Sequence, residues 1–172
     1  MDSKQGRQSE LYQQAVAELG PALVRLARAY ESDPDRQRDL LQDIHFALWQ
    51  SFAGFAGQCS LRTWVYRVAH NASISARVRR RRATMVSLEE IGETPAPDDV
   101  ESQAGDVRAL DRLRALIRRL KPPDDQVMLL YLEDADAVTI GEVTGLSPRA
   151  VATRIHRLKS LLAKQFHDRA NP

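Results

Sequence analysis

The side chains that could do the clearest chemistry lie near the end of the chain, between residues 147 and 160. Arginines recur along this stretch, and a guanidinium can donate two hydrogen bonds to a guanine edge or to a phosphate. Helical spacing places the arginines and neighbouring polar residues on or beside one side of a helix. In a major groove, that side would present a nucleic-acid-reading set: Ser147, Arg149, Thr153, Arg154, His156, Arg157 and Lys159.

The elements needed to hold this helix are present in residues 139–164, which follow the helix-turn-helix pattern. Gly145 stands where the chain must turn sharply, a position that glycine tolerates best. Ser147 is a favourable N-cap and Pro148 suits a first helical turn. The alternative is a solvated basic helix packed on a small bundle, and the Gly-Leu-Ser-Pro turn favours the DNA-binding interpretation. The apolar residues of the segment predict its buried side: Ile140, Val143, Leu146, Val151, Ile155, Leu158 and Leu162.

A second cation-rich stretch, residues 61–82, mixes aromatic and basic side chains and contains no acid. Aromatic faces stack on unpaired bases while arginines neutralise phosphates, so this composition is typical of single-strand binding. Trp64 lies on the apolar stripe of the predicted helix, where a core position is the simpler interpretation. Tyr66 lies off that stripe, and we expect it to be more available.

The usage of histidine, cysteine and glycine argues against an enzyme or a metal site. The four histidines (His45, His70, His156 and His167) and the single Cys59 are dispersed, with no nucleophile–base pair or metal-ligand spacing. The glycines form neither of the phosphate-cradling patterns GxGxxG and GxxxxGK[ST]. The sequence therefore predicts no catalytic residue, no cofactor and no metal.

Hydropathy argues against a membrane or secreted protein. No apolar run approaches the roughly 18–20 residues of a membrane span. The first residues, MDSKQGRQSELYQQ, lack the apolar core of a secretory signal. We therefore expect a cytoplasmic protein.

Charge is distributed in blocks that the net charge of +2 conceals. Residues 44–88 hold 7 basic and no acidic side chains, whereas residues 89–106 hold 7 acidic and no basic ones. Such asymmetry indicates polyanion-binding faces and an acidic tether. Because apolar residues recur at helical spacing nearly throughout, the sequence predicts an all-α protein. Two small helical domains, residues 1–82 and 107–172, are expected on either side of a flexible acidic linker, residues 83–106.

Prolines mark two boundaries in the first domain. Pro21 predicts a kink or the first turn of a new helix. The segment Ser32–Asp35 predicts a helix start, because Ser or Asp caps a helix and proline suits its first turn.

Three segments together resemble the extracytoplasmic-function (ECF) group of bacterial sigma factors. Residues 39–44 (DLLQDI), ending at Leu48-Trp49, are similar to the polymerase-binding helix of sigma region 2. Residues 60–69 (SLRTWVYRVA), followed by Asn71, resemble the stretch that melts and reads the promoter −10 element. Residues 120–123 (LKPP) and the helix-turn-helix resemble region 4, which reads the −35 element. The three segments follow the family order at matching separations.

The resemblance implies a protein that binds core RNA polymerase and gives it promoter specificity. Its partners would be promoter DNA, the clamp coiled coil of the largest polymerase subunit, the polymerase flap and an anti-sigma factor. The implied core-polymerase-binding residues are Asp39, Gln42, Asp43, Leu48 and Trp49. The implied −10 contacts, around a base flipped into loop 53–60, are Phe55, Gln58, Ser60, Arg62, Trp64, Tyr66, Arg67, His70, Asn71 and Arg77. The implied −35 contacts are the set between Ser147 and Lys159 given above.

The chain departs from the family pattern at a few positions. Gly141 stands where the family usually has alanine, at a helix-propensity cost of about 1 kcal/mol. His45 and Ala47 stand where the family usually has a larger apolar residue and a basic one. The alternative function is a helix-turn-helix regulator that binds operator DNA without polymerase, and it leaves the region-2-like half without a role.

Overall fold

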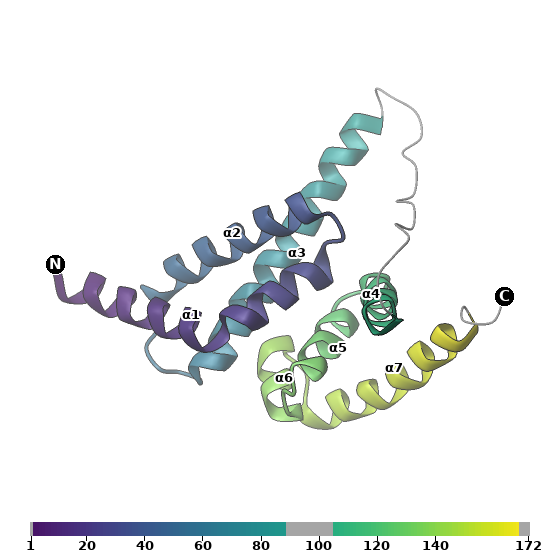
Figure 1. Ribbon diagram of the computed structural model, residues 1–172. Coiled ribbons are helices and arrows are strands. Elements are labelled where there is room, and N and C mark those ends of the chain that lie inside the picture. The colour runs from purple at the N-terminus through teal and green to yellow at the C-terminus, as the bar shows by residue number, and fades with distance from the viewer. Residues whose placement is uncertain (1, 89–104, 169–172) are drawn as a thin grey trace.

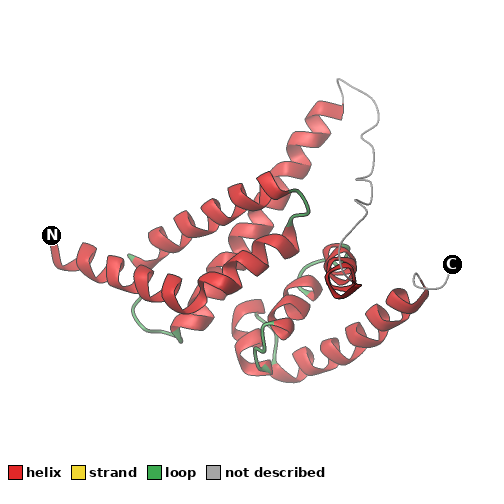
Figure 2. Cartoon of the chain, in the orientation of Figure 1, coloured by secondary structure: helices red, strands yellow, loops and turns green. Residues whose placement is uncertain are grey.

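The computed structural model describes residues 2–88 and 105–168, and these residues form helices joined by short loops, with no strand (Figures 1 and 2). The expected all-α fold is confirmed. No helix within these two ranges is long and apolar enough to span a membrane. In chain order the helices are α1 (Asp2–Tyr30), α2 (Pro34–Phe52), α3 (Leu61–Leu88), α4 (Gly105–Arg118), α5 (Asp124–Leu132), α6 (Ala137–Thr144) and α7 (Pro148–Asp168).

Helices α1, α2 and α3 pack on one another as the first lobe (Figure 1). α1 continues through Pro21 as one helix, so Pro21 does not begin a new one. α2 begins as the sequence predicts, because the Asp33 side chain accepts hydrogen bonds from the backbone N–H groups of Asp35 and Arg36 at 2.9 and 3.0 Å. The predicted apolar stripe of α2 lies in the core at Leu40, Ile44, Leu48 and Phe52.

α3 is longer than the sequence interpretation proposed. The helix passes the arginine run and ends at Leu88, and α4 begins at Gly105. Residues 83–88 and 105–106, which were expected in the linker, are therefore helical, and the rest of that linker lies outside the described residues. Arginine, alanine, methionine and leucine all favour helices, and no glycine or proline follows Arg79 before Gly92.

Helices α4 to α7 form the second lobe, in which α6 and α7 make the predicted helix-turn-helix (Figure 1). Gly145 ends α6 with a φ of 78°, a left-handed conformation that favours glycine. The Ser147 hydroxyl accepts a hydrogen bond from the Ala150 N–H at 3.2 Å and so caps α7. The buried side of α7 is the predicted one, with Val151, Leu158 and Leu162 in the core.

Gly141 has a steric role in this turn. A Cβ added there would lie 2.6 Å from the carbonyl oxygen of Leu146, because the turn folds back against α6. Helix propensity alone predicts that this glycine only weakens α6. The structure shows instead that the close approach of two backbone segments requires it.

We therefore expect Gly141→Ala to destabilise the protein. Overpacking of this kind costs about 1–3 kcal/mol, which outweighs the gain of about 1 kcal/mol in helix propensity. Gly20→Ala is the matched control, since a Cβ at Gly20 would meet only a Val16 methyl group at 3.9 Å. Chemical denaturation should show a lower free energy of unfolding for the first variant and a higher one for the second. Equal stabilisation by both would contradict the proposed steric role.

The two lobes dock through α3 on α6 and α1 on α4. A buried cluster of side chains from three helices also joins the lobes. Arg77 of α3 pairs with Asp125 of α5 at 2.8 Å, and its guanidinium lies 5.5 Å from the ring centre of Tyr30 in α1. The Tyr30 hydroxyl lies 2.9 Å from Nδ1 of His70. Burial raises the pKa values of Asp125 and Tyr30 and lowers the pKa of His70 to about 3.

The depressed pKa of His70 predicts acid sensitivity. Below a pH of about 6.5 the unfolded chain protonates this histidine and the folded one does not, so the free energy of unfolding falls as pH falls. At pH 5 the loss from this one group is about 2 kcal/mol. His70→Gln removes the titrating group, and denaturation at pH 7 and pH 5 should show a smaller acid loss for this variant than for the wild type. Asp125 acts in the opposite direction in both proteins, so the difference between them isolates His70, and identical losses would refute the prediction.

Candidate nucleic-acid interface

The predicted −35 residues gather along one side of α7. A surface groove is lined there by Ser147, Arg149, Ala150, Thr153, Arg154 and Arg157. His156 is exposed outside this groove. Lys159 extends toward α5, with its Nζ 3.4 Å from the Tyr131 hydroxyl and 5.5 Å from the ring centre. Five of the seven predicted residues therefore share one cation-rich groove.

One acidic side chain that the sequence interpretation missed organises this groove. Asp124, at the start of α5, contacts two arginines of α7 at once. Its Oδ1 pairs with Nη1 of Arg154, and its Oδ2 accepts from Nη2 of Arg157 at 2.9 Å. The only sequence signal was its position in a first helical turn, which acidic residues favour for unrelated reasons.

The loop between α2 and α3 carries the predicted −10 residues Phe55, Gln58 and Ser60. Gly57 has a φ of 78°, and the Gln58 side chain accepts a hydrogen bond from the Ala56 N–H at 2.8 Å. Ser60 precedes α3 and caps it, since its hydroxyl accepts a hydrogen bond from the Thr63 N–H at 3.0 Å.

Two predicted −10 aromatics pack beneath this loop. The rings of Phe55 and Trp64 have centres 5.2 Å apart. The Trp64 indole N–H donates to the Ser51 hydroxyl at 3.0 Å. The half-buried Trp64 thus helps to fix the loop, in line with its place on the apolar stripe.

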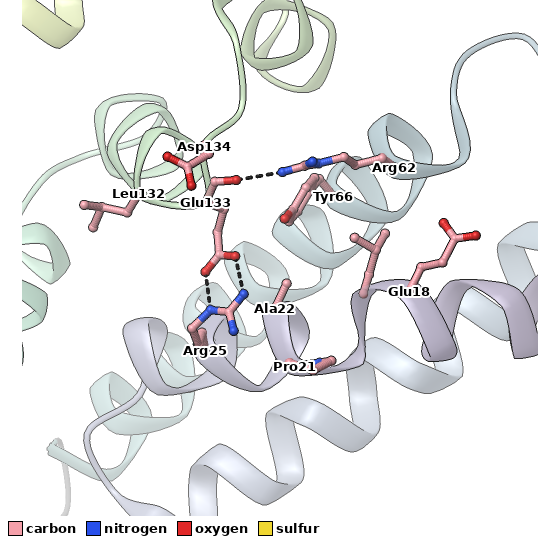
Figure 3. Close-up of a pocket in the computed structure, with 10 residues that line it drawn as sticks. Glu18, Pro21, Ala22, Arg25, Arg62, Tyr66, Leu132, Glu133 and Asp134 are labelled. Atoms are coloured by element: carbon pink, nitrogen blue, oxygen red, sulfur yellow. Dashed lines mark hydrogen bonds and ion pairs between the residues drawn. The ribbon is translucent and has the colours of Figure 1, made fainter.

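Two arginines of α3, Arg62 and Arg67, donate hydrogen bonds to the second lobe, and Figure 3 shows the contact of Arg62 with Glu133. Arg62 donates to the backbone oxygen of Glu133 at 2.7 Å, and Arg25 of α1 forms a two-bond pair with the Glu133 carboxylate, each bond 2.6 Å long. The hydrogen bonds to Glu133 raise the pKa of Arg25. One acidic residue after α5 therefore binds both α1 and α3.

A second acidic residue, Glu142 of α6, makes a similar contact further along α3. Its backbone oxygen accepts from Arg67 at 2.7 Å, and its carboxylate accepts from the Thr63 hydroxyl at 2.9 Å. Together with the Arg77–Asp125 pair, these contacts engage Arg62, Arg67 and Arg77 of α3 with the second lobe.

Two further expectations for α3 are corrected here. Tyr66, expected to be available, is only 1% exposed and lies beside Arg62 and Glu133 in the pocket between the lobes. His70, predicted to contact DNA, is also 1% exposed, and its Nδ1 faces Tyr30. α1 and the second lobe bury these side chains. The periodicity of a single helix cannot predict burial by other helices. Asn71 is exposed, as a DNA contact would require.

The predicted polymerase-binding face of α2 is only partly as expected. Asp39, Gln42 and Asp43 are exposed, but Leu48 is fully buried in the core. Trp49 is half-buried, with its ring edge-on to Tyr12 at 5.6 Å. Leu48 is therefore a packing residue in this structure, because it belongs to the same stripe as Leu40 and Ile44.

Phe46 is the residue of this face that the sequence interpretation missed. Its side chain is 63% exposed, and it follows Asp39, Gln42 and Asp43 at helical spacing on the same side of α2. A large apolar residue outside the buried stripe was the available signal. The Asp43 carboxylate is paired with Arg79 of α3 at 2.7 Å.

Metal binding has no evident place in the described part of the chain. No three His, Cys, Asp or Glu side chains there gather where they could hold an ion.

Comparison with known proteins divides the chain at the same place as the two lobes. Residues 15–83 match the sigma-70 region 2 family, and residues 110–162 match the sigma-70 region 4 family.

Curated relatives are sigma factors. The chain is 28% identical over 160 residues to the RNA polymerase sigma factor YlaC of Bacillus subtilis, covering 91% of this chain and 90% of YlaC. It is 26% identical over 141 residues to the ECF sigma factor SigW of Bacillus subtilis, covering 76% of this chain and 75% of SigW. It is 31% identical over 120 residues to the ECF sigma factor SigG of Mycobacterium tuberculosis, covering 69% of this chain but 31% of SigG.

Solved structures share the fold. CnrH, in complex with the cytosolic domain of CnrY, aligns with a TM-score of 0.65 at 21% identity, covering 98% of this chain and 99% of CnrH. RpoE of Bartonella quintana, in complex with the anti-sigma factor NepR, aligns with a TM-score of 0.69 at 19% identity, covering 89% of this chain and 94% of RpoE. With the two matched regions and the named relatives, these findings show that the chain belongs to the ECF group of the sigma-70 family, alternative sigma factors that direct RNA polymerase to promoters.

Proposed function

We propose that this chain starts transcription by dividing the work between its two lobes. The first lobe docks on core polymerase through the outer face of α2, which presents Asp39, Gln42, Asp43 and Phe46. The second lobe reads the −35 element with α7. The observation that carries the proposal is the groove on α7, where five residues chosen from sequence for base reading stand side by side.

Reading the −10 element requires a rearrangement in this proposal. Arg62, Arg67 and Arg77 are engaged by Glu133, Glu142 and Asp125 of the second lobe. The phosphate oxygens of a nucleic-acid backbone can accept the same guanidinium hydrogen bonds that these carboxylates and carbonyl groups accept. The lobes therefore separate before the cationic side of α3 can hold the melted strand. Tyr66 and His70 become candidate −10 contacts only in that opened form.

Further partners and location follow from the same proposal. CnrH and RpoE are each described in complex with a second protein, CnrY and the anti-sigma factor NepR. We propose that an anti-sigma factor binds this chain as well. We also propose that this chain acts in the cytoplasm and is not an enzyme. The domain limits 1–82 and 107–172 remain part of the proposal. Residues 83–106 lie between them as a tether, of which residues 83–88 continue α3 and residues 105–106 begin α4.

A regulator acting without polymerase is the weaker function. It would use α6 and α7 alone and would leave the exposed Phe46 face unexplained. The match of residues 15–83 to sigma region 2 also disfavours it.

The primary experiment is runoff transcription with purified core polymerase on a promoter library. We expect promoter-dependent products only when this protein is added, because core polymerase alone lacks promoter specificity. Folded protein that yields no product above core polymerase alone would sink the proposal. Tight operator binding without polymerase would support the regulator instead.

Variants in the two lobes should fail differently. Phe46→Ala and Asp43→Ala should both weaken core binding. The loss for Phe46→Ala should be about tenfold or more, since buried aromatic anchors carry much of an interface's free energy. Arg157→Ala should leave core binding unchanged and reduce initiation at promoters that depend on the −35 element by roughly 5- to 100-fold. Fluorescence titration with core polymerase and runoff assays measure the two effects. If the two effects were exchanged, the assignment of the lobes would be wrong.

Val138→Ala is the matched control for Phe46→Ala. Its side chain is also exposed, at 56%, but it lies on α6 in the other lobe. We expect unchanged core binding for this variant, and an equal loss would mean that exposed apolar area, rather than the α2 face, drives association.

A further inference from the structure

The position of Asp124 between two arginines is not explained by a role of the groove in attracting phosphate. Its carboxylate uses one oxygen for Arg154 and the other for Arg157. An acid placed against a DNA-reading surface repels phosphate, so affinity alone would disfavour it. Stability can account for the half-buried pair with Arg154, whose side chains are 34% and 20% exposed, but not for the exposed pair with Arg157, which contributes little to folding.

Asp124 is well placed to hold a fixed geometry. It lies in the first turn of α5, where its backbone N–H donates to the Lys121 oxygen at 2.9 Å. The following residues Val127, Met128 and Leu130 are buried in the core of the lobe. Its side chain is only 20% exposed, whereas that of Arg157 is 65% exposed. The carboxylate is thus the anchored partner, and the guanidinium groups are the ones it orients.

The contact also stands apart from the docking of the lobes. Asp124, Arg154 and Arg157 all belong to the second lobe, and none of the contacts described between the lobes involves them. Arg149 gives an internal comparison, since it lines the same groove and forms no ion pair within the described residues. Two of the three groove arginines are therefore restrained, and one is not.

We propose that Asp124 is a positioning residue that sets the −35 sequence preference by fixing the forks of Arg154 and Arg157. A long side chain loses rotamer freedom when it reads a base, and a side chain that is ordered beforehand loses less. Restraint also keeps a flexible guanidinium from adapting to a wrong base pair or sliding to a phosphate. Asp124 thus lowers general attraction to DNA and raises discrimination. This inference rests on the proposed reading of the −35 element by α7.

The test compares holoenzymes on a promoter selected from the library and on templates with substituted −35 or −10 elements. Asp124→Asn keeps the shape of the side chain and removes its charge. We expect the ratio of initiation on matched to mismatched −35 templates to fall roughly tenfold, the scale of one well-placed base contact. The corresponding ratio for the −10 element should not change, because the first lobe reads it. A purely structural defect would lower initiation on every template alike.

Matched variants sharpen the result. Asp111→Asn removes the same charge from an exposed pair with Arg114 in the same lobe and should keep the −35 ratio. The effect of Asp124→Asn should be less than additive with Arg157→Ala and additive with Arg149→Ala, as expected for residues that do and do not share a contact. Thermal melting checks folding, and Asp124→Ser, which also suits a helix start, must give the same fall in the ratio if Asp124→Asn is unstable.

Three outcomes would overturn the inference. An unchanged −35 ratio in Asp124→Asn would show that the contact does not affect reading. A uniform rise in initiation on all −35 templates would show that Asp124 only repels DNA. A wild-type holoenzyme that initiates from the library but shows no −35 preference would remove the proposed role of α7, and this inference with it. If the wild type discriminates and the variant keeps that discrimination, the inference fails while the proposed function stands.

Discussion

The arrangement of the two lobes depends on the carboxylate of Asp125, which can be buried only together with a cation and hydrogen-bond donors. Asp125 is 1% exposed, and a carboxylate taken out of water at that depth costs several kcal/mol unless a cation and hydrogen bonds accompany it. Arg77 supplies the cation from the other lobe, and the Gln126 N–H supplies a hydrogen bond at 2.8 Å. Separating the lobes must therefore rehydrate both partners together. The contacts of Glu133 and Glu142 lie closer to solvent and are weaker constraints.

In the proposed function, the same arginines serve two states of the molecule. With the lobes together, Arg62, Arg67 and Arg77 satisfy acids and carbonyl groups of the second lobe. In the proposed open state they would bind phosphates instead. The exchange replaces one set of charge-assisted hydrogen bonds by another, so its net free energy is much smaller than either set alone. Such a balance suits a protein whose partners decide which state is populated.

Sequence patterns identified the helices, the caps at Asp33 and Ser147, and the turn at Gly145, because local rules govern these features. They also selected five α7 residues that lie together in one groove, and the role of these residues in DNA reading stays a prediction. They did not predict the burial of Tyr66 and His70, which depends on α1 and the second lobe. They also missed Asp124, whose partners lie 30 and 33 residues away in sequence. Gly141 was misread for the same reason, because its constraint is the backbone of a later turn.

The pair between Asp43 and Arg79 joins the side of α2 that is proposed to bind polymerase to the arginine run of α3. Under the proposed function, a polymerase group that binds the Asp43 carboxylate sets Arg79 free, and a phosphate that binds Arg79 does the same for Asp43. Thermodynamic reciprocity then requires each event to favour the other by the same factor. Both side chains are at least half exposed, so this coupling is worth at most about 1 kcal/mol, or roughly fivefold. A single weak surface contact would in this way link the capture of the enzyme to the capture of its template.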